Sequence, residues 1–242
     1  MPRILELFCG HADVSRVFRD KGWDTVTVDF DEKHNADIIE DIIHWDYTVY
    51  PKDHFDFIWA SPDCRSWSLL SNRHHNLYNN LKPESECAVL GEKMIHATHA
   101  ILDYFQPYVY CIENPRARLR RWAPMARHPF RTTVYYNNHG FPNVKPTDLW
   151  SNIPLWEEER KPPTILWKDC KPKARSRIPV PLIEKLYHHV NECVYSVVWY
   201  LNRVSNPYGH IAERVVSTLL FVISWLYASI QLLLPELRQC SL

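Results

Sequence analysis

Short apolar runs and amphipathic stretches alternate through the first half of the chain. Apolar runs typical of buried strands occupy residues 3–8, 24–30, 55–60 and 108–112. Apolar side chains at helical spacing occur between them, at residues 13–21 and 84–105. The first of these stretches stops before Gly22, a residue type that often follows a helix end. The alternation predicts βαβ units, and therefore an α/β fold with a doubly wound, mostly parallel sheet.

Reactive and charged residues gather where the predicted strands end. The strand ends read Phe8-Cys9-Gly10, Asp29, Pro62-Asp63-Cys64 and Glu113-Asn114-Pro115. In open α/β sheets ligands bind outside the carboxyl ends of the strands. Each of these residues alone would pass for an ordinary loop residue, but together they predict a site at that edge of the sheet.

The charge of the chain is balanced, with 28 Lys and Arg against 28 Asp and Glu. No overall field therefore favours nucleic acid as a partner, and binding would depend on local patches. One basic patch follows the strand end at Glu113 and contains no acidic residue. Its arginines are Arg116, Arg118, Arg120, Arg121, Arg127 and Arg131. A second basic patch spans residues 161–177. Such patches contact phosphates in nucleic-acid-binding proteins, although a solvated charged face has the same composition.

The seven cysteines are irregularly spaced, and no Cys or His pair has the spacing of zinc ligands. This pattern indicates a reducing compartment without a disulfide framework, and no metal is expected. The first residues enter an apolar strand directly and lack the apolar segment of a signal peptide. We therefore expect a cytoplasmic or nuclear protein that is not secreted.

The order of the motifs resembles that of the DNA (cytosine-5) methyltransferase family in its small viral or phage-like form. The matching segments are LELFCG, VTVDFD, EDIIHWDY, ASPDCRSWS, YCIENP and HGFPNVKPTDLWSN. The resemblance covers residues 3–190 and implies a Rossmann-like methyltransferase that uses S-adenosylmethionine and acts on DNA.

The resemblance also assigns the chemistry. Carbon 5 of cytosine is a poor nucleophile, so Cys64 would add to C6 of the ring and make it electron-rich. Glu113 would supply the proton at ring N3. The base would have to leave the duplex to reach these groups.

The resemblance implies cofactor contacts from Glu6, Phe8, Gly10, Asp29, Asp41, Ile42 and Pro62. Phe8 would pack on the adenine, Asp29 would bond the ribose hydroxyls, and Asp41 and Ile42 would meet the adenine edge. For Asp29 the alternative is an ordinary strand cap, and for Asp41 a solvated loop residue. Nucleic acid would contact Asn114, Arg116, Arg118, Arg120 and Lys145.

Two departures from the family pattern leave other functions open. His11-Ala12-Asp13 stands where the family has glycines, so Asp13 would either crowd the cofactor or cap the next helix. Asp63 replaces a proline beside Cys64, where a like charge would oppose thiolate formation unless the carboxylate points away. A catalytically weak DNA-binding relative is therefore one alternative. Another is a methyltransferase that acts on an exocyclic amino group, because Ser61-Pro62-Asp63 resembles the loop of such enzymes. An RNA cytosine is a further alternative as the substrate.

The resemblance divides the chain into a catalytic domain at 1–190 and a helical, hydrophobic extension at 191–242. Only the short segment 148–173 is left for target recognition, so we expect short or loose specificity. The polar stretch 68–83 after Cys64 resembles a loop that closes over the flipped base. The uncharged stretch 218–234 predicts a helix that self-associates, packs on protein or contacts a membrane.

Overall fold

The computed structural model describes residues 1–68, 78–79, 82–164 and 177–204. The chain divides into two compact units, residues 1–194 and 195–242. Most of the predicted closing loop, most of the second basic patch and the whole of 218–234 lie outside the described residues. Within the described residues, no helix is long and apolar enough to cross a membrane.

A seven-stranded sheet forms the centre of the first unit, in the order β3-β2-β1-β4-β7-β9-β8. The strands are β1 (Arg3–Leu7), β2 (Asp24–Asp29), β3 (Ile38–Ile39), β4 (Phe57–Ala60), β7 (Val109–Pro115), β8 (Phe130–Tyr135) and β9 (Pro146–Ser151). The first five in the sheet are parallel, whereas β9 runs antiparallel to both β7 and β8. A separate pair joins β5 (Tyr78–Asn79) to β6 (Lys82–Pro83). The predicted mostly parallel sheet is confirmed.

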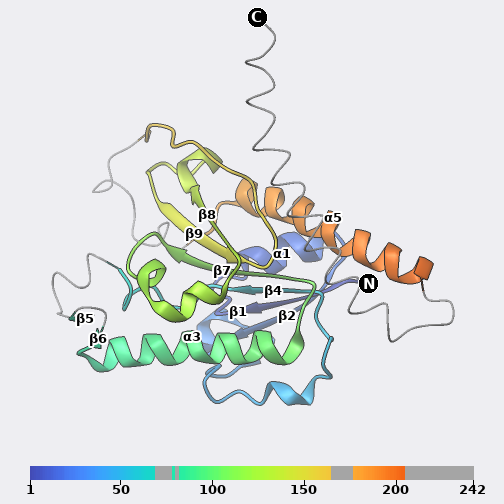
Figure 1. Ribbon diagram of the computed structural model, residues 1–242, viewed down its shortest axis with the longest axis horizontal. Coiled ribbons are helices and arrows are strands. Elements are labelled where there is room, and N and C mark those ends of the chain that lie inside the picture. Colours follow the sequence, from blue (N-terminus) through green and yellow to red (C-terminus); the bar gives the residue numbers. More distant parts are fainter. Residues whose placement is uncertain (69–77, 80–81, 165–176, 205–242) are drawn as a thin grey trace, which may run out of the picture. The chain divides into compact units, whose positions relative to one another are not determined.

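Helices cover both faces of the sheet, as the doubly wound fold requires. The α-helices are α1 (Asp13–Asp20), α3 (Glu86–Phe105) and α5 (Val180–Val204). Figure 1 shows α3 along one face and α1 with α5 along the other. The short 3-10 helices are η1 (Glu32–His34), η2 (Tyr47–Val49), η3 (Leu119–Arg121), η4 (Ala123–Arg127) and η5 (Tyr136–His139).

Alternating side chains along the strands fill two apolar layers. Leu5 and Leu7 of β1 belong to a buried cluster that includes Phe105 of α3. On the opposite face the ring of Phe18 in α1 stacks on Phe57 of β4, with centroids 5.2 Å apart. A sheet buried on both faces needs apolar residues at successive positions, which explains the continuous apolar runs in the sequence.

Strand β7 is longer than the sequence predicts. The apolar run stops at Ile112, but the strand continues to Pro115 because β9 pairs with it. In this antiparallel register Glu113 lies opposite Leu149 and Asn114 opposite Asp148. Glu113 and Asn114 are therefore held by a strand rather than a loop.

Two buried histidines connect α3 to the loop before β8. His99 Nε2 lies 3.0 Å from His128 Nε2, and the Tyr110 hydroxyl lies 2.9 Å from His128 Nδ1. Burial lowers the pKa of His99 to about 4, with a further contribution from the charge of Arg127. Burial also lowers the pKa of His128 to about 3, helped by His99. Both rings are therefore neutral in the folded protein at neutral pH.

This pair predicts a loss of stability in mild acid. In the unfolded chain both rings bind protons near the ordinary pKa of 6.5, whereas the folded state resists them down to about 4. The contribution of the pair to the free energy of unfolding is fully present above pH 6.5 and is lost as the pH falls toward 4. Between pH 7 and 5 the wild-type chain should lose roughly 2–4 kcal/mol more unfolding free energy than the His99→Gln/His128→Gln variant.

Urea unfolding at the two pH values measures this difference. Other titrating groups, including Glu6, are common to both chains and cancel in the comparison. Parallel pH dependences in the two chains would contradict the assignment.

Candidate functional site

The parallel strands bring four loops to one edge of the sheet. Leu7 at the end of β1 pairs with Val28 of β2 and with Ala60 of β4, and Ala60 in turn pairs with Ile112 of β7. The segments that follow these residues therefore leave the sheet side by side. The predicted residues at all four strand ends meet at this edge.

The loop after β4 is tied to β7 by a buried hydrogen bond. Asn114 Nδ2 donates to the carbonyl oxygen of Pro62 at 2.9 Å, and the Asn114 side chain is fully buried. Beyond Pro62 the Cys64 carbonyl accepts hydrogen bonds from the N–H groups of Trp67 and Ser68, which closes a turn. Trp67 is also fully buried. Asn114, for which a nucleic-acid contact was expected, thus positions the loop that carries Cys64.

The carboxylate of Asp63 is turned toward Arg65. Arg65 donates to it from its backbone N–H at 2.8 Å and from Nε at 2.6 Å. Burial and, to a smaller extent, the charge of Glu113 raise the pKa of the Cys64 thiol to about 11, against the lowering effect of the Lys145 charge. Asp63 raises this pKa less than burial and Glu113 do. The expected opposition from Asp63 is therefore present but secondary.

Tyr136 makes direct contact with Glu113. Its hydroxyl donates to Glu113 Oε1 at 2.8 Å, and both side chains are buried. The Lys145 ammonium lies 4.3 Å from the centroid of the Tyr136 ring. The predicted phosphate contact of Lys145 stays a prediction, and its charge in this structure lies near Cys64 and Tyr136.

Sequence reasoning missed Tyr136. It stands at the start of η5, outside the strand-end pattern, and no spacing relates it to Glu113. The nearest signal in the sequence was the segment HGFPNVKPTDLWSN, which begins shortly after it.

The loop after β1 and the end of β2 form the expected cofactor edge. The N–H of Gly10 donates to Asp29 Oδ2 at 2.9 Å, and the N–H of Asp31 donates to Asp29 Oδ1 at 3.0 Å. Both Phe8 and Gly10 have positive φ, and a Cβ on Gly10 would meet no atom within 4 Å. The backbone at Gly10 is therefore open to a ligand, and Asp29 keeps lone pairs available for hydroxyl donors.

An exposed aromatic residue flanks Asp29. Phe30 is 65% exposed, and Ile39, which pairs with Asp29 across β2 and β3, is 48% exposed. Exposed apolar side chains beside a carboxylate fit a nucleoside, which has an apolar base and a hydroxylated sugar. The adenine contact expected of Phe8 stays a prediction, and Phe30, which the sequence analysis did not select, is a further candidate.

Asp41 and Ile42 support the same edge from a turn. Asp41 Oδ1 accepts from the N–H of Ile43 at 3.0 Å, and the Asp41 carbonyl accepts from the N–H groups of His44 and Trp45. The Ile42 side chain is buried in the apolar cluster under α3. The adenine contact expected from Ile42 would therefore fall to its backbone.

Glu6, on strand β1, stabilises the first turn of α1. Ala12 occupies the N-cap position with φ of 51° and supplies no side-chain cap. Instead Glu6 Oε2, buried in β1, accepts from the N–H of Ser15 at 2.6 Å. Burial raises the pKa of this carboxyl to about 7, against the opposing effect of the bonds to Ser15.

Asp13 joins the first loop to the segment before α5. Arg177 Nε donates to Asp13 Oδ2 at 2.7 Å, and Arg177 Nη2 donates to Oδ1. Arg16 Nη2 donates to Oδ1 at 3.0 Å. The expectation that Asp13 caps the helix is wrong, because it lies inside the first turn of α1 with its carboxylate paired to arginines.

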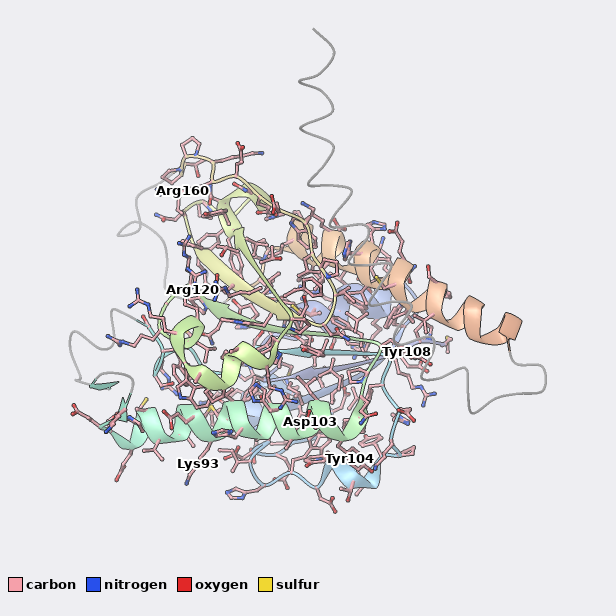
Figure 2. The ribbon with its side chains drawn as sticks, in the orientation of Figure 1. Lys93, Asp103, Tyr104, Tyr108, Arg120 and Arg160 are labelled. Atoms are coloured by element: carbon pink, nitrogen blue, oxygen red, sulfur yellow. The ribbon has the colours of Figure 1, made fainter. Side chains whose placement is uncertain are left out.

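The arginines after Glu113 divide into anchored and exposed groups. Arg120 Nε lies 3.2 Å from Oδ2 of Asp148, a fully buried carboxylate, and Arg127 pairs with Asp103. Figure 2 shows Arg120 at the carboxyl-end side of the sheet, with Asp103 on α3 toward the other end. Arg127 is exposed although it is paired, Arg118 is half-buried, and the exposed members outside these ion pairs are Arg116, Arg121 and Arg131. Among the described residues no cluster of His, Cys, Asp and Glu could hold a metal ion.

Comparison with known proteins finds one informative relative. No protein-family model matches the chain. The chain is 32% identical to the "Probable DNA (cytosine-5)-methyltransferase" of Frog virus 3 (isolate Goorha) over 158 residues, which are 62% of this chain and 71% of the relative.

Two solved structures of methyltransferases are more distant. Entamoeba histolytica methyltransferase EhMeth has a TM-score of 0.45 at 12% identity, covering 67% of this chain and 57% of that one. The S. pombe Dnmt2 methyltransferase has a TM-score of 0.44 at 13% identity, covering 64% and 52%. The chain spans about half the length of these two proteins. The similarity to the viral relative is the finding that bears on family.

Helix α3 approaches the Cys64 turn at Gly91. A Cβ on Gly91 would lie 2.0 Å from Ser66 Oγ and 2.7 Å from Ser66 Cβ. Ser66 is itself buried, so it has little room to move.

The Gly91→Ala variant should therefore push Ser66 and the turn away from α3. We expect a loss of about 1–3 kcal/mol in unfolding free energy, typical of overpacking, measured by urea unfolding. Ser66→Gly removes both clashing atoms, so the double variant should lose less than the sum of the two single changes. Additive losses would show that the two residues are not in contact.

Proposed function

The chain belongs to the DNA (cytosine-5) methyltransferase family, and from this premise we propose that it methylates cytosine C5 in DNA through a covalent bond between Cys64 and C6. The observation that carries this proposal is the meeting of Cys64 and Glu113 at adjoining strand ends, close enough for Glu113 to raise the pKa of the thiol. The bond from Asn114 to Pro62 holds the two segments together.

Each of the two residues acts on a different atom of the cytosine ring. The Cys64 thiolate forms a bond to C6, and electrons move through the ring toward N3, where Glu113 supplies a proton. This leaves C5 electron-rich, and S-adenosylmethionine would supply the electrophilic methyl group that C5 takes up. Loss of the C5 proton to water then expels the Cys64 thiolate, and the N3 proton returns to Glu113, which restores the neutral ring.

The cofactor would lie along the ends of β1 and β2. The open backbone at Gly10, the Asp29 carboxylate and the exposed side chains of Phe30 and Ile39 fit its nucleoside part. The Asp13 carboxylate, which would otherwise repel a cofactor carboxylate, is neutralised by Arg177.

DNA would pass the exposed arginines beside Glu113. Within the described part of the chain, Arg116, Arg121 and Arg131 are exposed and form no ion pair, so they suit phosphate contacts, whereas Arg120 is anchored by Asp148. Such contacts carry no sequence information, which agrees with loose specificity. The many unpaired thiols suit a reducing cytoplasmic or nuclear location.

A catalytically weak DNA-binding protein is the second candidate. Burial raises the pKa of Cys64 to about 11, so little thiolate exists at neutral pH in the free protein. This feature would lower activity without altering the fold.

Covalent trapping tests the mechanism. Incubated with S-adenosylmethionine and DNA containing 5-fluorocytosine, the protein should form an adduct that survives denaturing electrophoresis, because fluorine cannot leave C5 as a proton does. The adduct should be absent in Cys64→Ser and persist in Cys87→Ser, which removes an exposed thiol of α3. Absence of an adduct in a folded protein that binds the cofactor would favour the weak DNA-binding alternative. An adduct that forms with RNA containing 5-fluorocytosine, and not with the DNA, would show that RNA is the substrate.

Alkylation of Cys64 by iodoacetamide should depend steeply on pH in the free protein. With a pKa of about 11, the thiolate fraction and the rate should rise about tenfold per unit between pH 7 and 9. Lys145→Gln should slow the reaction, because the Lys145 charge lowers this pKa, and Lys145→Arg should not. Peptide mass spectrometry distinguishes Cys64 from the other thiols, and a flat profile would contradict the raised pKa.

A further inference from the structure

Tyr136 is buried against the carboxyl group that the proposed reaction uses. It is 0% exposed, and its hydroxyl donates to Glu113 Oε1 at 2.8 Å. A phenol has one hydrogen to donate, so this donor is committed to Glu113. Thr147 is a further hydrogen-bond partner of the same hydroxyl.

The surroundings of Tyr136 prevent it from turning away. Its backbone N–H donates to the Lys145 carbonyl at 3.2 Å, and the Lys145 ammonium lies 4.3 Å from its ring centroid. The Phe141 ring meets the Tyr136 ring edge to face, with centroids 6.1 Å apart. The hydroxyl is therefore held in place before any substrate arrives.

The hydroxyl acts as a donor and not as an acid. Burial raises the pKa of Tyr136 well above its ordinary value of 10, and the charge of Glu113 raises it further. The phenol consequently keeps its proton across the range in which an enzyme of this kind works. Any effect of Tyr136 on the reaction must pass through Glu113.

We propose that Tyr136 is a positioning residue for Glu113, and that its hydroxyl fixes Oε1 so that Oε2 is the oxygen that exchanges a proton with cytosine N3. This inference rests on the proposed function. A carboxyl group can rotate, and either oxygen could then face the base. The bond to Tyr136 selects one orientation of the carboxyl. Cys64 lies within electrostatic range of both Glu113 and Tyr136, so the fixed carboxyl and the thiol act on the same cytosine ring.

The Tyr136→Phe variant removes the hydroxyl and keeps the ring that packs against Lys145 and Phe141. At saturating DNA and S-adenosylmethionine, kcat should fall about 10- to 100-fold while KM for both stays within about threefold. This split between kcat and KM is what a positioning role predicts, because substrate binding is kept and only the alignment of Glu113 is lost. A residue that only filled space would lower stability and leave kcat of the folded protein unchanged.

Tyr104→Phe provides the matched control. The Tyr104 hydroxyl donates to the Tyr50 carbonyl at 2.9 Å, and Figure 2 shows Tyr104 on α3 toward the end of the sheet away from Arg120. This variant loses the same group and a similar hydrogen bond, and its kcat and KM values should match those of the wild type. Equal losses of kcat in both variants would overturn the inference.

A second replacement covers the case in which Tyr136→Phe does not fold. 3-Fluorotyrosine at position 136 is nearly isosteric and keeps the hydroxyl donor, so kcat should stay within about threefold of the wild-type value. A wild-type kcat in folded Tyr136→Phe, or a loss of about tenfold or more in the folded 3-fluorotyrosine protein, would overturn the role of Tyr136, while the wild-type 5-fluorocytosine adduct leaves the proposed function intact. Absence of that adduct in the wild type would instead overturn the proposed function itself.

Discussion

The parallel pairing of β4 with β7 is the constraint on which the site depends. Ala60 lies opposite Ile112, so the chain leaves both strands at the same edge and brings Cys64 toward Glu113. The hydrogen bond from Asn114 to Pro62 then fixes the distance between the two segments. Successive side chains of a strand point to opposite faces, so a slip of one residue would turn Glu113 away from the site.

Burial is the largest physical influence on the ionisable groups at this edge. It is the first cause of the raised pKa values of Glu6, Cys64 and Tyr136. A site with little water strengthens every remaining interaction, so the single positive charge of Lys145 and the single donor of Tyr136 count for more than they would in solvent. The same burial makes an unpartnered group costly, which explains why Glu6 accepts the backbone N–H of Ser15.

Three carboxylates near the site are compensated by arginines, and two of them, Asp13 and Asp63, looked unfavourable in the sequence. The pairs are Asp13 with Arg177, Asp63 with Arg65 and Asp148 with Arg120. Two of these carboxylates are buried, and removing one partner of a buried pair costs more than the pair contributes, because a charge is left without a counterion. Part of the basic patch is therefore structural, and the exposed arginines carry the remaining positive surface.

The sequence by itself determined the alternation of strands and helices, the strand ends at Cys64 and Asp29, and the family. These features are local, since they follow from apolar periodicity and from motifs of a few adjacent residues. Only the tertiary structure decided that β7 continues through Glu113, because that extension depends on pairing with β9. It also decided that Tyr136 bonds Glu113 and that Asn114 bonds Pro62, across 23 and 52 residues of chain. A hydrogen bond between distant residues leaves no period or spacing in the sequence, and the packing of the whole sheet is what selects its partners.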